Sequence, residues 1–249
     1  MKVESFLMFT ACAMISSGLN FAQAEDFDIS PKLDGSNKIV TNGFVDATEV
    51  EVENVRVFAY AFGEIPGQPF FLPDPGFHPL PGSGFAQNSL IGFNLAAPLR
   101  YWSGSGSPTF FPVGSGESIQ FNFGANSVVT RGSAVPSPAG FSFGLVDAAG
   151  EFDDHLETYL LGAGGTVANP GSPAEGIYLV TFAVTSSTSG VMPSEPVYEL
   201  FSNGAFESEL LPAAIYVRDT FAPGSTLVVP EPAMIASLAG LAMLSRRRR

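Results

Sequence analysis

The stretch that most restricts the fold of this chain runs from Val50 to Phe62, where the residue character alternates. Valines and alanines at positions 50, 52, 55, 57, 59 and 61 alternate with charged and aromatic residues at positions 51, 53, 56, 58, 60 and 62. A period of two places successive side chains on opposite faces of a β-strand. We therefore predict a strand here and expect strands to dominate the fold.

Several other segments carry the same kind of pattern. Residues 118–123, 141–145 and 177–185 are predicted strands, and residues 38–41, 90–95, 157–161 and 197–201 are weaker candidates. Within the second of these, Phe141, Phe143 and Leu145 are expected to share one face. Residues 64–85 and 103–116 are rich in Gly and Pro, which predicts long loops.

One segment, from Glu207 to Phe221, has helical spacing instead. Its apolar residues Leu210, Ala214 and Val217 recur at intervals of three or four, and Pro212 is expected in the first turn. The chain of 249 residues also contains 23 Phe, 27 Gly and 20 Pro, a mixture that favours strands and turns. We predict a mainly β domain over residues 25–226, an antiparallel β-sandwich of jelly-roll type with one late helix.

The charge balance of the body is strongly acidic. Between the terminal segments, six basic residues stand against twenty-two acidic ones. Such a surface repels phosphate backbones, so we exclude nucleic acid as a partner; solubility or Ca²⁺ binding would explain the acidity. The only cysteine, Cys12, lies in the N-terminal apolar run, so disulfides and thiolate chemistry are excluded from the body.

The N-terminus has the pattern of a secretory signal peptide, residues 1–24. Lys2 precedes an apolar run at residues 6–15, and Ala22 and Ala24 form a small-x-small cleavage site followed by acidic residues. An uncleaved anchor is the alternative, but the apolar run is short for a bilayer. We therefore predict export through the secretion translocon and cleavage by signal peptidase.

The C-terminal segment, residues 227–249, has three parts. Pro230, Glu231 and Pro232 come first and separate the tail from the body. An apolar run at residues 233–244 follows, which spans about 18 Å as a helix against roughly 30 Å of hydrocarbon. The chain ends in the basic cluster Arg246, Arg247, Arg248 and Arg249, which the positive-inside bias places in the cytoplasm. We therefore predict that the tail is a short transmembrane helix, which is only marginally long enough to span the bilayer even when residues 227–229 are added.

These three parts together resemble the PEP-CTERM sorting signal, over about residues 229–249. Pro230, Glu231 and Pro232 match its motif one for one. The resemblance implies recognition by exosortase, an integral-membrane transpeptidase-like enzyme of bacteria that make extracellular polysaccharide. It implies transient anchoring with a cytoplasmic C-terminus, then cleavage and release or attachment at the cell surface or extracellular matrix. An ordinary single-pass anchor is the alternative.

An acid-rich stretch of the body contains one of its two histidines. If it is a strand, Asp153, His155 and Glu157 share a face and could hold a divalent metal, with His78 joining them across the fold. Because carboxylates outnumber nitrogens, Ca²⁺ fits this set better than Zn²⁺. The alternative is an exposed acidic edge. No other cofactor is expected.

The pair Tyr101 and Trp102 is the candidate for stacking on a sugar ring, with core packing as its alternative. The sequence lacks a nucleophile elbow, a phosphate loop and a dinucleotide motif. We therefore predict that the body is not an enzyme and has a structural or interaction role in the envelope or matrix. A carbohydrate-binding module for extracellular polysaccharide, with or without calcium, is the second hypothesis, and a secreted hydrolase is the third.

Overall fold

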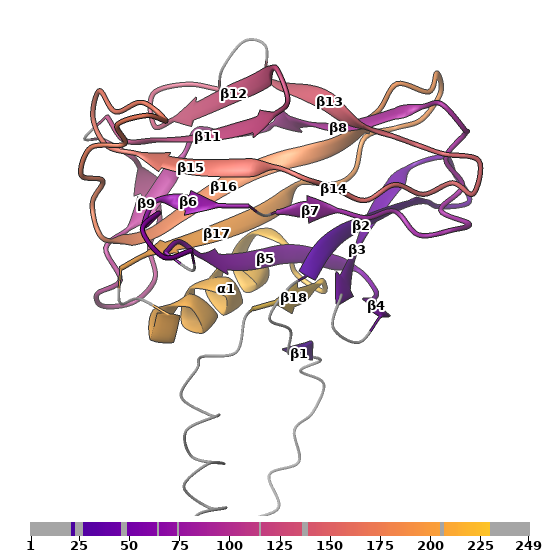
Figure 1. The fold of residues 1–249 in the computed structure, drawn as a ribbon. Coiled ribbons are helices and arrows are strands. Elements are labelled where there is room, and N and C mark those ends of the chain that lie inside the picture. Colours follow the sequence, from indigo (N-terminus) through magenta and orange to yellow (C-terminus); the bar gives the residue numbers. More distant parts are fainter. Residues whose placement is uncertain are drawn as a thin grey trace, which may run out of the picture.

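The computed structural model of the chain describes residues 21–22, 27–45, 49–63, 65–73, 75–114, 116–135, 139–204 and 207–229. The cleavage-site residue Ala24, the motif Pro230–Pro232, the apolar run and the arginine cluster lie outside these ranges. Within them the protein is mainly β, with three sheets and one helix (Figure 1). No helix in these ranges has the length and apolar character needed to cross a bilayer.

The largest sheet has nine strands. Seven follow one another in the order β1 (Phe21–Ala22), β18 (Thr226–Val228), β5 (Val55–Ala61), β17 (Val197–Asn203), β16 (Gly176–Ser186), β8 (Leu90–Leu95) and β13 (Gly140–Leu145). The remaining two are β9 (Arg100–Trp102), which pairs with β16, and β10 (Phe111–Pro112), which pairs with β9. The long strand β16 is the centre of the sheet because it pairs with three neighbours.

Two smaller sheets lie on the same side of the large one (Figure 1). One contains β12 (Asn126–Arg131), β11 (Ser118–Phe123), β15 (Glu157–Leu161) and β6 (Phe71–Leu72) in this order. The other contains β14 (Asp154–His155), β7 (Gly76–Phe77), β2 (Phe27–Leu33), β3 (Ile39–Val45) and β4 (Val50–Val52). The chain passes from one to the other between β6 and β7 and again between β14 and β15.

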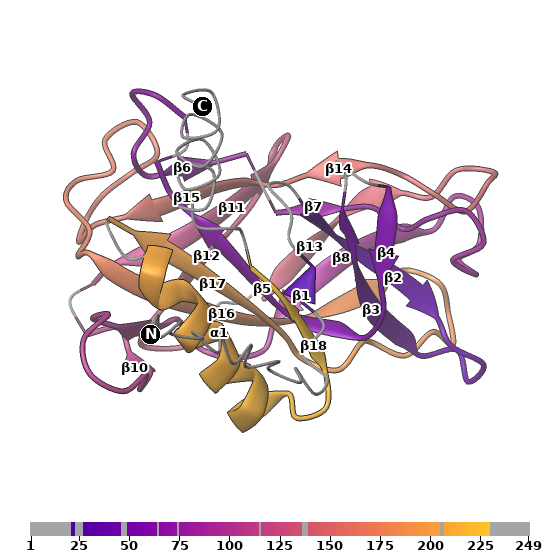
Figure 2. The ribbon, with the colours of Figure 1, turned by 90° about the horizontal axis from the view of Figure 1, so that it is seen from below.

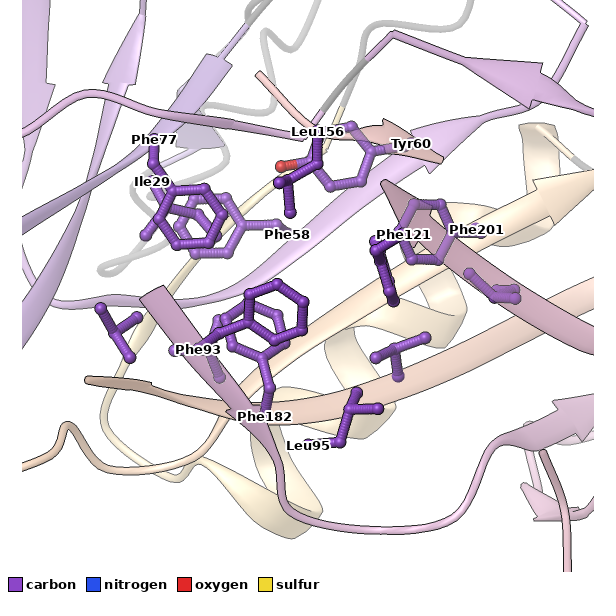
Figure 3. Packing of buried hydrophobic residues seen from close by; sticks show 14 of the residues in the cluster. Ile29, Phe58, Tyr60, Phe77, Phe93, Leu95, Phe121, Leu156, Phe182 and Phe201 are labelled. Atoms are coloured by element: carbon purple, nitrogen blue, oxygen red, sulfur yellow. The ribbon is translucent and has the colours of Figure 1, made fainter. Parts of the chain in front are cut away.

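The main hydrophobic core lies between the large sheet and the two smaller ones. Its buried side chains come from all three sheets, and many are phenylalanines whose rings meet edge to face (Figure 3). Phe93 of β8, for example, lies within 5.5 Å of the rings of Phe121 and Phe182, measured between centroids. Edge-to-face pairs add to the stabilisation that burial of the rings provides.

The predicted helix is confirmed as α1 (Glu207–Phe221), on the outer face of the large sheet (Figure 2). It buries Leu210, Ala214 and Val217 against the outward side chains of β5 and β17, which form a second hydrophobic cluster. Pro212 was expected in the first turn but is the sixth residue of α1. It is exposed to solvent there, so water can hydrate the carbonyl that its missing N–H leaves without a partner.

The large sheet contains parallel pairs, contrary to the expected antiparallel arrangement. Both β17 and β18 pair with β5 in parallel, on its two sides, and in the second small sheet β2 pairs with β7 in parallel. Parallel strands need a crossover connection, and α1 supplies it between β17 and β18. In the described chain, α1 therefore returns the backbone to the start of the sheet, so that β18 runs in the same direction as β17.

The stretch from Val50 to Phe62 forms two strands rather than one. A turn with a positive φ at Asn54 separates β4 from β5, which belong to different sheets. Strand β5 is buried on both faces, with Phe58 and Tyr60 in the main core and Val57 and Ala59 under α1. Parallel strands covered on both sides have this character, so the alternation does not mark a solvent face.

Two further boundaries differ from expectation. Leu227 and Val228 are buried in β18, so the folded body extends to Val228 and these residues do not lengthen the apolar tail. In β13 the register shifts between Ser142 and Gly144. This β-bulge keeps Phe143 in the core but turns Leu145 outward, where it is 55% exposed.

Candidate functional site

Three neighbouring strands of the second small sheet bring two histidines and two aspartates together. Strand β7 lies between β2 and β14, with Ile29 opposite Phe77 on one side and Asp154 opposite Phe77 on the other. The backbone N–H of His78 donates to the carbonyl of Ile29 at 2.9 Å, which extends the pairing by one residue. Asp28, His78 and His155, each one residue away from a paired position, therefore lie side by side on neighbouring strands.

Alternation along the strands decides which side chains face outward. Ile29, Phe77 and Leu156 are buried in the main core. Their neighbours Asp28, His78 and His155 consequently project from the opposite face of the sheet. A sheet that buries one face in this way presents its polar residues together on the other.

The group is compact. Asp28, His78 and Asp153 each offer one potential ligand atom, and these atoms lie within 4.8 Å of one another. His78 Nδ1 is 3.9 Å from Asp28 Oδ2, and His155 Nε2 is 3.1 Å from Asp153 Oδ1. Burial falls from Asp28, which is 1% exposed, through His78 to the exposed Asp153, so the site opens to solvent on one side.

Gly76 makes room for this group. A Cβ atom on Gly76 would overlap the Asp28 carboxylate and come within 2.9 Å of His155 Cε1. The backbone of β7 therefore forms a shelf on which the carboxylate and the imidazole both lie. The ring of Phe44, 4.7 Å from that of His78 between centroids, covers the histidine.

The electrostatics of the group are those of crowded negative charge. Burial raises the pKa of the adjacent Asp154 carboxyl, and the charge of Asp153 adds to the effect. His78 Nδ1 is itself buried and has no hydrogen-bond partner among the described residues. A cation between these groups would neutralise the carboxylates and engage the free ring nitrogen.

The expected metal set is met in part. Asp153, His155 and His78 do come together, whereas Glu157 does not join them. Leu156 turns into the core between the two sheets, and Glu157 begins β15, where it lies opposite Asn122. Its carboxylate instead accepts a hydrogen bond of 3.2 Å from the Tyr159 hydroxyl.

Asp28 takes the place expected for Glu157, and sequence reasoning missed it. Residues 27–33 were not predicted to form a strand, although Phe27, Ile29 and their intervening acid alternate. The local signal was an acid between two apolar residues that both turn out to be core. Nothing near Asp28 in the sequence indicates that β7 and β14 lie beside it.

The expected stacking pair Tyr101 and Trp102 is built into the fold instead. Trp102 is only 4% exposed, packs on Phe110 beneath α1, and donates its indole N–H to the carbonyl of Ser105. The Tyr101 hydroxyl donates to the carbonyl of Glu175 at 2.6 Å. The Trp102 ring therefore offers no face to a surface ligand, which favours the core-packing alternative.

A different group of aromatic residues borders a surface groove of about 300 Å³. Phe71 on β6 and Tyr159 on β15 lie opposite each other in register, with ring centroids 4.9 Å apart. The groove is completed by residues from two loops: Gly67, Gln68, Pro69, Phe70, Val167 and Pro170. Backbone hydrogen bonds, such as that from Gly162 N–H to the Pro170 carbonyl at 2.8 Å, hold these loops in place.

Comparisons with known proteins do not supply a function. No family model, no curated protein and no solved structure matches the chain. Any functional conclusion therefore rests on the residues of this chain and on their arrangement.

Proposed function

We propose that this chain is an exported protein that exosortase sorts to the cell surface or extracellular matrix, where its body acts by binding rather than by catalysis. Residues 1–24 direct export through the translocon and are removed by signal peptidase. The tail then anchors the protein transiently, with its C-terminus in the cytoplasm, until it is processed. The short apolar run followed by Arg246–Arg249 supports a processing substrate over a permanent anchor.

The observation that carries this proposal is the way the sorting motif adjoins the folded body. Strand β18 ends at Val228, which is buried, and Pro230 follows two residues later. The motif therefore follows directly on the last described strand of the chain, so cleavage at the motif would leave β18 in the large sheet. A processing enzyme in the membrane would then separate the folded body from the sorting tail.

Mass spectrometry of the native protein tests this proposal. Surface or matrix material is expected to begin after Ala24 and to lack the C-terminal arginines. Replacing Pro230 and Pro232 by alanine should leave uncleaved protein in the membrane fraction, while the control Pro223→Ala, in the exposed turn after α1, should be processed normally. Mature surface protein that still ends in Arg249 would overturn the processing step.

We also propose a finer description of the architecture. The large sheet and the two smaller ones enclose one aromatic core, an arrangement that supports a jelly-roll-like β-sandwich. The parallel pairs around β5 are a departure from that type, confined to the side that carries α1.

A second candidate function, saccharide binding, is favoured by the groove between Phe71 and Tyr159. Aromatic faces and proline edges suit the C–H surface of a pyranose ring, and the Glu157 carboxylate beside the Tyr159 hydroxyl can accept sugar hydroxyls. No Lys or Arg lines the described groove, so a neutral polysaccharide fits it better than a uronate polymer. The volume is at the lower end for small-ligand sites.

Calorimetric titration with neutral oligosaccharides tests this second function. Tyr159→Ala should weaken binding by tenfold or more, because the stacking of one aromatic ring on the sugar is lost. The control Phe111→Ala removes another exposed ring, 64% accessible, on β10 of the large sheet, whereas the groove lies on β6 and β15 of a smaller sheet. Equal binding by both variants would remove the groove as a saccharide site.

A further inference from the structure

We propose that Asp28, His78 and Asp153 bind a divalent transition-metal ion, for which Zn²⁺ is the probe, and that His155 positions Asp153. The three ligands come from β2, from the residue after β7 and from the residue before β14. The proposal does not depend on the sorting signal. It concerns only the folded body.

The distances suit a shared ion better than direct contact. His78 Nδ1 and Asp28 Oδ2 are 3.9 Å apart, which is too long for a hydrogen bond. An ion about 2.0–2.4 Å from each atom fits between them. Since Nδ1 is buried and has no hydrogen-bond partner among the described residues, an ion would satisfy it where a protein donor or acceptor does not.

The ligand types select the class of metal. Ca²⁺ takes six to eight oxygen ligands, whereas imidazole nitrogen with two carboxylates suits Zn²⁺ and its neighbours in the transition series. The group keeps two carboxylates, as in the set that the sequence indicated, but its three ligand atoms are only half or fewer of the six to eight that Ca²⁺ takes. A water molecule would complete four-coordination on the side where Asp153 meets solvent.

His155 acts on the ion through Asp153. Its Nε2 lies 3.1 Å from Asp153 Oδ1, within reach of a hydrogen bond that orients the carboxylate. Gly76 keeps the space in which both His155 and Asp28 lie. Partners that orient a metal ligand commonly change affinity by 10- to 100-fold when they are replaced.

The test uses the full exported protein without a histidine tag, stripped of metal and titrated with Zn²⁺ or Ca²⁺ alone. Zn²⁺ at about 100 times its dissociation constant should raise the melting temperature by roughly 5–10 °C. Because the chain contains only two histidines, imidazole NMR resonances report the site directly. The His78 signals are expected to shift with one equivalent of Zn²⁺.

Variants distinguish binding of Zn²⁺ at the proposed site from nonspecific binding to surface carboxylates. His78→Gln and Asp28→Asn should each abolish the shift in melting temperature, and His155→Gln should weaken affinity 10- to 100-fold. Asp219→Asn, an exposed carboxylate on α1, is the matched control and should bind Zn²⁺ normally. If Asp28→Asn does not fold, His78→Gln alone decides the outcome. Zn²⁺ that leaves the His78 resonances unchanged, or Ca²⁺ that stabilises equally, would overturn the proposal.

Discussion

Among the described residues, the two most deeply buried acids, Asp28 and Glu199, lie in opposite surroundings. Asp28, on the outer face of β2, has two histidines and a second aspartate nearby. Glu199, on β17, is 0% exposed in the main core, where its neighbours are Phe77, Phe93, Phe121, Leu156 and Phe182. Neither carboxyl oxygen of Glu199 has a hydrogen-bond partner among the described residues.

The contrast shows that burial alone does not make a site. Burial raises the pKa of Glu199 well above its ordinary range, because the apolar core favours the protonated form of this acid. Asp28 instead lies where histidine nitrogen and a second carboxylate can share a cation with it. The surroundings of Glu199 favour its protonated form, whereas those of Asp28 contain other groups that can share a cation, as we propose.

The largest expected effect comes from a substitution that disrupts the aromatic core around Glu199. Phe93 is 2% exposed, and four other phenylalanine rings lie within 6.3 Å of its ring between centroids. Phe93→Ala should lower the free energy of unfolding by about 3–5 kcal/mol. Urea denaturation measures this, and Phe111→Ala at an exposed position should cost under about 0.5 kcal/mol. Equal losses would mean that the aromatic core is not packed as described.

The next effect concerns Glu199 itself and has the opposite sign. Glu199→Leu keeps a similar volume and removes an unpaired polar group, so it should raise the free energy of unfolding at pH 7 by about 1–3 kcal/mol. The measurement is again urea denaturation, with Glu209→Leu on the helix as an acid-to-leucine control at a partly exposed site. A destabilised Glu199→Leu protein would indicate that the carboxyl has a partner that stabilises the fold.

The pH dependence sharpens the same point. The folded-state pKa of Glu199 is raised by burial above the ordinary value near 4.5. Its contribution to stability is therefore present below that ordinary value and is lost as pH rises toward the folded-state pKa. In that window the wild type should lose up to about 1.4 kcal/mol per pH unit more than Glu199→Gln does. If the unfolding free energies of the two proteins change equally with pH, the pKa of Glu199 is not raised in the folded state.

A smaller effect tests the other acid. Gly76→Ala forces the Asp28 carboxylate and the His155 ring away from the shelf of β7, which should cost about 1 kcal/mol of unfolding free energy. Asp28 can rotate, so the cost is modest, but Zn²⁺ binding should be lost with the geometry. Gly35→Ala, which meets nothing within 4 Å, is the control. Normal Zn²⁺ affinity in Gly76→Ala would show that the ion does not lie there.

Sequence patterns anticipated most of the strands but not their partners. Residues 90–95, 118–123 and 157–161 were predicted with the boundaries of β8, β11 and β15, because period-two patterns depend on local geometry alone. The helix was predicted with its exact residues for the same reason. Asp28 was missed because its role depends on β2 lying beside β7, which are far apart in the chain, and no local pattern encodes that pairing.

The smallest expected effect tests the β-bulge in β13, where the alternation of buried and exposed residues is interrupted. A strict period of two places Leu145 in the core with Phe143, whereas the bulge between Ser142 and Gly144 turns it to solvent. Leu145→Ser should therefore change the free energy of unfolding by less than about 0.5 kcal/mol, while Phe143→Ala should cost about 3 kcal/mol or more. A large loss of unfolding free energy for Leu145→Ser would indicate that Leu145 is buried and that the strand has no bulge. Gly144 lies at the bulge against the ring of Phe152, which a Cβ atom on Gly144 would overlap. Gly144→Ala should therefore disturb the strand more than Leu145→Ser does.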